Sequence, residues 1–180
     1  MIDTTSPSPS EAVIPDDDPQ RQLTVANSDD PQMLHVAVAG DTYTILVRGA
    51  ETAGRYCLID MHVPAGGGPP PHRHDFEEMF TLLEGELEFT FRGQTSTVRA
   101  GSIVNIPANA PHAFKNASST AVRMLCMATP AGLDEFFLEI GDVVNGRTAP
   151  PPKLTPEELS DRQKKVGSLL SKYRTEMVAT

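Results

Sequence analysis

The chain has 180 residues, 39% of them hydrophobic, and a formal net charge of −9 at pH 7. This length suits one domain with appendages, and such acidity argues against a surface for nucleic acid or for an anionic membrane. The sequence has no apolar run that approaches the length of a bilayer span, and its N-terminus lacks the features of a signal peptide. Its two cysteines, Cys57 and Cys126, form no C-x-x-C pattern. We therefore expect a cytoplasmic protein with neither a membrane nor a nucleic-acid partner.

Residues 1–32 are rich in Ser, Pro and Asp and include three consecutive aspartates at 16–18. Few apolar side chains are present there to offset the entropy lost on ordering the backbone. The composition predicts a disordered or loosely attached N-terminal arm.

Residues 33–130 contain short β-type runs separated by Gly and Pro. Apolar and polar residues alternate at 43–47, 57–63, 87–91 and 122–126. Alternation with a period of two, interrupted by turns, is typical of an antiparallel β-sandwich or barrel. The apolar member of each pair is expected to face the interior.

Residues 131–180 are predicted to form a helical extension. Leu133, Phe136, Phe137 and Ile140 have helical spacing, and Gly141 could end that helix. After a run of three prolines, Thr155 and Pro156 are typical of an N-cap and the first helical residue. An apolar stripe on this last helix predicts packing against the barrel or a partner subunit; it comprises Leu159, Val166, Leu169, Leu170 and Tyr173.

A Gly- and Pro-rich segment leads into a cluster of metal-ligand residue types. In a strand that begins near His72, the side chains of His72, His74 and Glu78 share one face, whereas Glu77 points away, provided that no bulge intervenes. Two imidazoles and a carboxylate in an apolar interior are costly without a partner. A divalent first-row metal accepts these donors. His112 follows a Pro-rich turn and could complete the set, although a satisfied polar core network is an alternative.

At these residues the sequence resembles the cupin superfamily. Its first motif, G-x5-H-x-H-x3-E-x6-G, is matched by Gly66, His72, His74, Glu78 and Gly85. Its second motif, G-x5-P-x-G-x2-H-x3-N, is matched by Gly101, Pro107, His112 and Asn116, with Asn109 in place of the usual Gly. Because Asn tolerates the left-handed conformation, the turn is expected to survive. The resemblance implies an all-β fold, an antiparallel double-stranded β-helix (a jelly-roll or cupin barrel) with a C-terminal helical extension, and a homodimer.

Within cupins, the stretch around Gly66–Phe91 and the later helix that contains Phe136 and Phe137 resemble small single-domain proteins related to quercetin 2,3-dioxygenases. This resemblance implies a metal-dependent dioxygenase acting on a small aromatic or enolisable substrate. His72, His74 and His112 would hold one divalent transition metal, for which Fe, Mn, Ni, Co and Zn remain candidates. Glu78 would complete the coordination or act as the catalytic base. An apolar cavity could raise the pKa of Glu78 and so suit it as a base near neutrality.

Two other functions fit the same motif. A metal-dependent isomerase or lyase could use the site as a Lewis acid on a keto or sugar substrate, and a non-catalytic cupin could simply bind a small ligand. No DNA-binding segment accompanies the barrel, which argues against a transcription factor. Candidate pocket residues are Phe80, Phe114, Met124 and Met61, although ordinary core packing also explains them.

Overall fold

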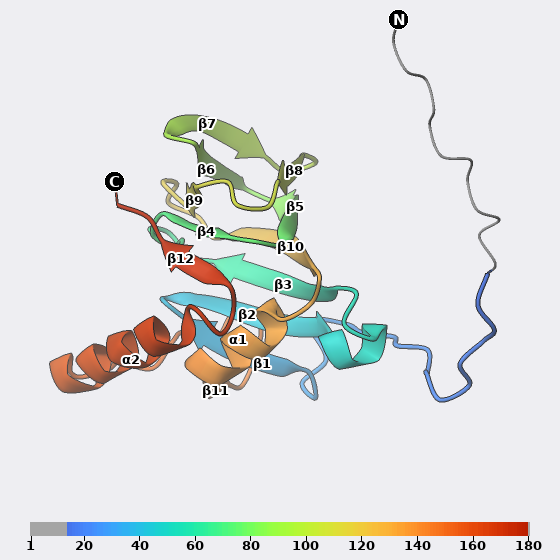
Figure 1. Cartoon of the computed structure of the whole chain (residues 1–180). Helices are drawn as coiled ribbons and strands as arrows, with labels where there is room; N and C mark the ends of the chain where they lie inside the picture. Colours follow the sequence, from blue (N-terminus) through green and yellow to red (C-terminus); the bar gives the residue numbers. More distant parts are fainter. Residues whose placement is uncertain (1–13, 180) are drawn as a thin grey trace, which may run out of the picture.

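Two antiparallel β-sheets face each other in a computed structural model that describes residues 14–179 (Figure 1). In order across it, the larger sheet contains β11 (Asp142–Val144), β1 (Leu34–Val38), β2 (Asp41–Val47), β3 (Cys57–Val63), β10 (Val122–Thr129), β5 (Glu77–Glu84) and β8 (Ile103–Ile106). The smaller sheet contains β12 (Thr175–Met177), β4 (His72–His74), β9 (His112–Lys115), β6 (Glu86–Phe91) and β7 (Gln94–Arg99). Together the sheets form the expected jelly-roll barrel, and the predicted alternating strands are confirmed as β2, β3, β6 and β10.

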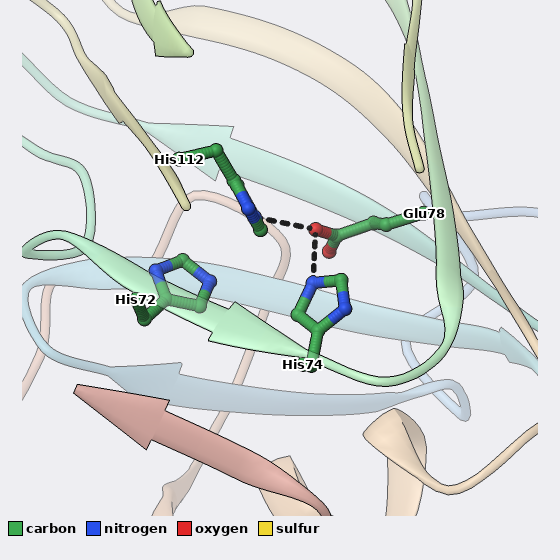
Figure 2. Close-up of side chains that lie close together, drawn as sticks. All are labelled: His72, His74, Glu78 and His112. Atoms are coloured by element: carbon green, nitrogen blue, oxygen red, sulfur yellow. Dashed lines mark hydrogen bonds and ion pairs between the residues drawn. The ribbon is translucent and has the colours of Figure 1, made fainter. Parts of the chain in front are cut away.

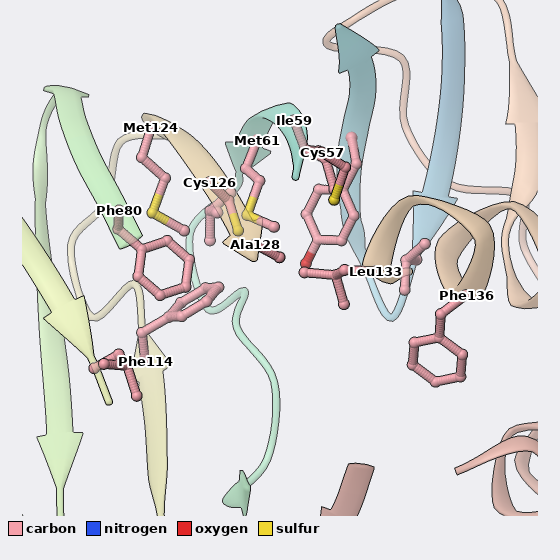
Figure 3. Close-up of a cluster of buried hydrophobic side chains, with 14 of the residues drawn as sticks. Cys57, Ile59, Met61, Phe80, Phe114, Met124, Cys126, Ala128, Leu133 and Phe136 are labelled. Atoms are coloured by element: carbon pink, nitrogen blue, oxygen red, sulfur yellow. The ribbon is translucent and has the colours of Figure 1, made fainter. Parts of the chain in front are cut away.

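The hydrophobic core fills the space between the sheets (Figure 3). The pairing register aligns the inward-facing residues of neighbouring strands: the ladder between β10 and β3 places Met124 opposite Met61 and Cys126 opposite Ile59. Each of these side chains is at most 2% exposed. Burying one large apolar side chain contributes about 1.5–3 kcal/mol, so these inward rows are a main source of stability for the barrel.

Both predicted helices are present. Helix α1 (Leu133–Ile140) ends at Gly141, whose N–H donates to the carbonyl of Phe137. Helix α2 (Pro156–Leu169) is capped at its N-terminus by Thr155, whose hydroxyl accepts the N–H of Glu158 in a capping box. The predicted stripe packs against the core at Val166, Leu169, Leu170 and Tyr173, whereas Leu159 remains exposed. No helix among the described residues is long and apolar enough to cross a membrane.

The C-terminal extension also contributes two short strands that the sequence did not predict. Strand β11 pairs with β1, and β12 pairs with β4, where Thr175 lies opposite His74 and Met177 opposite His72. An ion pair joins Arg73 to Glu176 across this ladder. The C-terminal segment is therefore part of the smaller sheet as well as a helical cover.

The N-terminal arm can be described only from residue 14 onward, because residues 1–13 lie outside the described part of the chain. Residues 14–33 contain no helix or strand, and most of their side chains are exposed. Ser28 is an exception, because it is buried and its hydroxyl accepts a hydrogen bond from Arg123 in β10. The division of the chain into segments 1–32, 33–130 and 131–180 stays a prediction.

Candidate metal centre

His72, His74, Glu78 and His112 converge in the interior between the two sheets (Figure 2). One potential ligand atom from each residue lies within 4.8 Å of those of the others. The three histidines come from β4 and β9 in the smaller sheet, and Glu78 comes from β5 in the larger sheet. The carboxylate thus faces the imidazoles from the opposite sheet.

The continuous strand expected from residue 72 onward is wrong. The chain leaves the smaller sheet after His74 and enters the larger sheet at Glu77, because β4 pairs with β9 and β12 whereas β5 pairs with β10 and β8. Glu78 is nevertheless buried and Glu77 exposed, as the parity argument predicted.

The glycine-rich loop before β4 positions His72 at the site. The N–H of Gly66 donates to the carbonyl of Asn116, whose own N–H donates to the carbonyl of Gly67. Gly68 has a φ of +124°, and a Cβ added there would lie 2.1 Å from the carbonyl oxygen of Phe114. Glycine permits both this backbone conformation and this close approach. The loop is therefore fixed against β9, the strand that carries the third histidine.

The turn before β9 positions His112 and is joined to β4. Asn109 has a φ of +67°, which confirms that Asn replaces the usual Gly in the left-handed conformation. Its N–H donates to the carbonyl of His74 at 2.6 Å. The second motif thereby holds the backbone of the first.

Backbone carbonyls fix the tautomer of all three histidines. Each Nδ1 lies 2.9–3.0 Å from a carbonyl oxygen: His72 from Pro70, His74 from Phe76 and His112 from Ala110. A carbonyl can only accept, so Nδ1 carries the proton and a neutral ring keeps its lone pair on Nε2. Histidine ligands are typically oriented in this way.

The carboxylate of Glu78 then faces acceptors rather than donors. Its Oε2 lies 3.0 Å from Nε2 of His74 and 3.2 Å from Nε2 of His112. An ionised carboxylate and two lone pairs at these distances require a proton or a cation among them. Three imidazole nitrogens and one carboxylate oxygen fit a divalent first-row metal.

Burial and mutual contact shift the pKa values of His72, His112 and Glu78. Burial lowers the pKa of His72 to about 4, so this ring is neutral at pH 7. For His112, burial acts to lower the pKa, but the adjacent Glu78 outweighs it and the net shift is upward. Burial also acts to raise the pKa of Glu78, yet the contacts of its carboxylate with His112 and His74 outweigh burial and hold the pKa well below its ordinary value. The expected rise in the pKa of Glu78 is therefore wrong.

Two further residues contact the cluster, and sequence reasoning did not assign either of them to it. The ring of Phe76 stacks on that of His74, with centroids 3.8 Å apart and planes 1° from parallel. The thiol of Cys126 donates to Oε1 of Glu78 at 3.2 Å. Burial and the nearby Glu78 hold the pKa of Cys126 well above its ordinary value, so the thiol stays protonated. Both contacts depend on register and turn geometry, which the sequence alone does not reveal.

The four candidate pocket residues lie in the barrel interior (Figure 3). Phe80 is two residues beyond Glu78 on the same strand, and its ring centroid lies 5.6 Å from that of Phe114. Met61 and Met124 face each other across the ladder between β3 and β10. Their role as substrate contacts stays a prediction.

Comparison with known proteins gives relatives of differing function. The chain is 26% identical over 121 residues to quercetin 2,3-dioxygenase of Bacillus subtilis, covering 67% of this chain and 35% of that protein. It is 27% identical over 112 residues to the HTH-type transcriptional regulator PuuR of Escherichia coli, covering 62% of this chain and 60% of the regulator. The chain thus spans about a third of the first relative and less than two thirds of the second.

A solved structure shares the fold. The polyketide cyclase RemF from Streptomyces resistomycificus aligns with a TM-score of 0.54 and 20% identity, covering 82% of this chain and 99% of the cyclase. At this identity the likeness concerns the fold alone. Residues 59–128 match the model of the cupin domain family, and this span contains the whole His/Glu cluster. With its jelly-roll barrel and both histidine motifs in place, this part of the chain is a cupin domain.

Proposed function

We propose that this cupin is a metal-dependent dioxygenase acting on a small aromatic or enolisable substrate. The observation that carries the proposal is the set of three imidazoles whose Nδ1 atoms are all bound to carbonyls, which leaves Nε2 of each ring available beside Glu78. The similarity to a quercetin 2,3-dioxygenase supports this reaction class. Because the chain spans only 35% of that relative, the reaction itself rests on the test below.

In this proposal His72, His74, His112 and Glu78 hold one divalent metal, which when bound supplies Lewis-acid polarisation and, for a redox-active element, access to O₂ chemistry. Glu78 is the only carboxylate among these four side chains, so it is the group suited to accept a proton from a substrate hydroxyl. A carboxylate is a weak base, so it is suited to an acidic hydroxyl, as on a phenol or an enol.

The surroundings of the cluster favour an apolar ring as substrate. Phe80, Phe114 and Met124 are each at most 4% exposed, and they form the apolar interior beyond Glu78. An apolar pocket with a few polar groups binds small ligands by burying most of their surface. We infer that repacking of these side chains sets the size of substrate that is accepted.

The first test is the metal content of untagged protein purified without chelator. We expect nearly one metal per chain in the wild type and none in the His72→Ala/His112→Ala variant. Oxygen uptake with flavonols and dihydroxy-aromatics then tests the reaction. Wild-type protein that stays empty and also refuses added Fe, Mn, Ni, Co and Zn would remove the basis for the proposal.

A second candidate is a ligand-binding domain without chemistry, which the similarity to the regulator PuuR favours. Saturable binding of a small molecule, with no product under air and with several metals, would support it. An isomerase or lyase on a keto or sugar substrate is separated from the dioxygenase by turnover without oxygen consumption.

We also propose that the chain forms a homodimer, as its family resemblance implies. Alternation along β3, β5, β8 and β10 turns a second set of apolar side chains outward on the larger sheet. This set comprises Leu58, Met79, Ile103, Leu125 and Met127. Sedimentation velocity is expected to give a dimer that Leu125→Glu converts to a monomer, and a monomeric wild type would contradict the proposal.

A further inference from the structure

The two carboxylate oxygens of Glu78 have different partners. Oε2 faces the histidines, whereas Oε1 points toward β10 and accepts the thiol proton of Cys126 at 3.2 Å. In the ladder between β5 and β10, Glu78 lies opposite Ala128 and Cys126 lies opposite Phe80. Cys126 is therefore the diagonal inward neighbour of Glu78, within reach of its side chain.

This contact satisfies an oxygen that would otherwise be costly to bury. Glu78 is 5% exposed and Cys126 is 0% exposed. A buried acceptor without a donor costs about 1–3 kcal/mol, and more when it is charged. Among the hydrogen bonds of the described residues, the thiol of Cys126 is the one donor to Oε1, and the methyl group of Ala128 offers none.

The contact also restrains a torsion that is otherwise loose. The terminal torsion of a glutamate is broad and nearly two-fold, so packing alone does not determine which oxygen points where. A donor fixed in the centre of β10 selects one orientation, because rotation of the carboxylate would break the S–H···Oε1 bond.

We propose that Cys126 is a positioning residue, whose S–H···Oε1 hydrogen bond holds the carboxylate of Glu78 with Oε2 turned toward His74 and His112. Its effect on metal binding rests on the proposed function, but the hydrogen bond does not. The two can therefore be tested separately.

Infrared spectroscopy of the S–H stretch tests the hydrogen bond in metal-free protein. The chain has two cysteines, both free and buried, so Cys57→Ala leaves Cys126 as the sole thiol and Cys126→Ala leaves Cys57. In the Cys57→Ala background, Glu78→Gln should move the S–H band to higher frequency, because an amide oxygen is a weaker acceptor than a carboxylate. In the Cys126→Ala background, the same Glu78→Gln substitution should leave the S–H band of Cys57 unmoved. An unmoved Cys126 band overturns the proposal.

Metal affinity tests the consequence. Partners of metal ligands typically contribute roughly 10–100-fold to affinity, so Cys126→Ala should weaken binding by about that factor. Cys126→Ser, whose hydroxyl also donates, should restore most of the affinity, and Cys57→Ala should bind as the wild type does. Equal affinities for Cys126→Ala and the wild type overturn the positioning role. Wild-type protein that takes up no metal overturns the proposed function instead, and the infrared response of Cys126 then decides the positioning role.

Discussion

Replacing Glu78 with Gln removes the negative charge of the cluster without removing its shape. In the apo protein the amide group of Gln can donate to the Nε2 lone pairs of His74 and His112, which the carboxylate cannot do without an added proton. The amide oxygen can still accept the thiol of Cys126 at the place of Oε1. We therefore expect Glu78→Gln to fold with a thermal midpoint at least as high as that of the metal-free wild type.

The metal-induced shift of the midpoint should nearly disappear in this variant. A ligand present at 100 times its Kd stabilises a protein by about 2.7 kcal/mol, which is roughly 5–11 °C for a domain of this size. Mutation of a residue that merely hydrogen-bonds to a metal ligand typically lowers metal affinity by roughly 10–100-fold. Loss of a direct ligand is therefore expected to lower the affinity by on the order of 100-fold. At the same metal concentration the variant then sits at its Kd and gains about 0.4 kcal/mol, roughly 1–2 °C.

Differential scanning fluorimetry with and without each candidate metal measures both quantities. Glu77→Gln is the matched control, because Glu77 is adjacent in sequence but exposed, and it should keep the full shift. A Glu78→Gln protein that keeps the wild-type shift would refute the inference that this carboxylate is a ligand.

Three other perturbations test the surrounding structure. Thermal unfolding should show that Gly68→Ala costs at least twice as much as Gly93→Ala, because both glycines have positive φ but only the first would place a Cβ against a main-chain oxygen; equal losses would contradict this. Burial raises the pKa of Asp41 to about 7 in the folded protein, whereas an unfolded aspartate has a pKa near 4. The folded state therefore keeps the proton over this range, and the free energy of unfolding falls by on the order of 4 kcal/mol as the pH rises from about 4 to about 7. Denaturant unfolding between pH 4 and 8 should therefore show a smaller decline for Asp41→Asn than for the wild type, and parallel curves would exclude this explanation. Glu176 lies opposite Arg73 at a hydrogen-bonded position of the ladder between β12 and β4, and Glu176→Pro removes its backbone N–H donor. Calorimetric titration should therefore show weaker metal binding for Glu176→Pro than for Glu176→Ala. Identical affinities would argue against support of β4 by β12.

The sequence predicted the features that depend on local pattern. Alternation identified β2, β3, β6 and β10, and spacing with capping residues identified both helices. The convergence of His72, His74, Glu78 and His112 followed from motif spacing, because inward parity is the same whether or not the chain changes sheets between β4 and β5. That parity is also why the change of sheet was not foreseen.

Features that depend on contacts between distant segments were not predicted. The role of Cys126 requires the register between β5 and β10, which places it diagonal to Glu78. The lowered pKa of Glu78 requires the knowledge that two imidazoles meet the same carboxylate oxygen. A three-residue strand such as β12 has no periodicity to detect, and its partner lies about a hundred residues away in the chain.

The pairing of β12 with β4 has a consequence for the protein as it is synthesised. Arg174 and Asp75, which are ion-paired beside this ladder, are 99 residues apart. At a translation rate of 5–20 residues per second, the strand that carries His72 and His74 leaves the ribosome roughly 5–20 s before its outer neighbour exists. During that interval its outer edge is an open template for pairing with other chains. The nascent protein thus makes two of its candidate metal ligands about a hundred residues before the strand that closes the edge beside them.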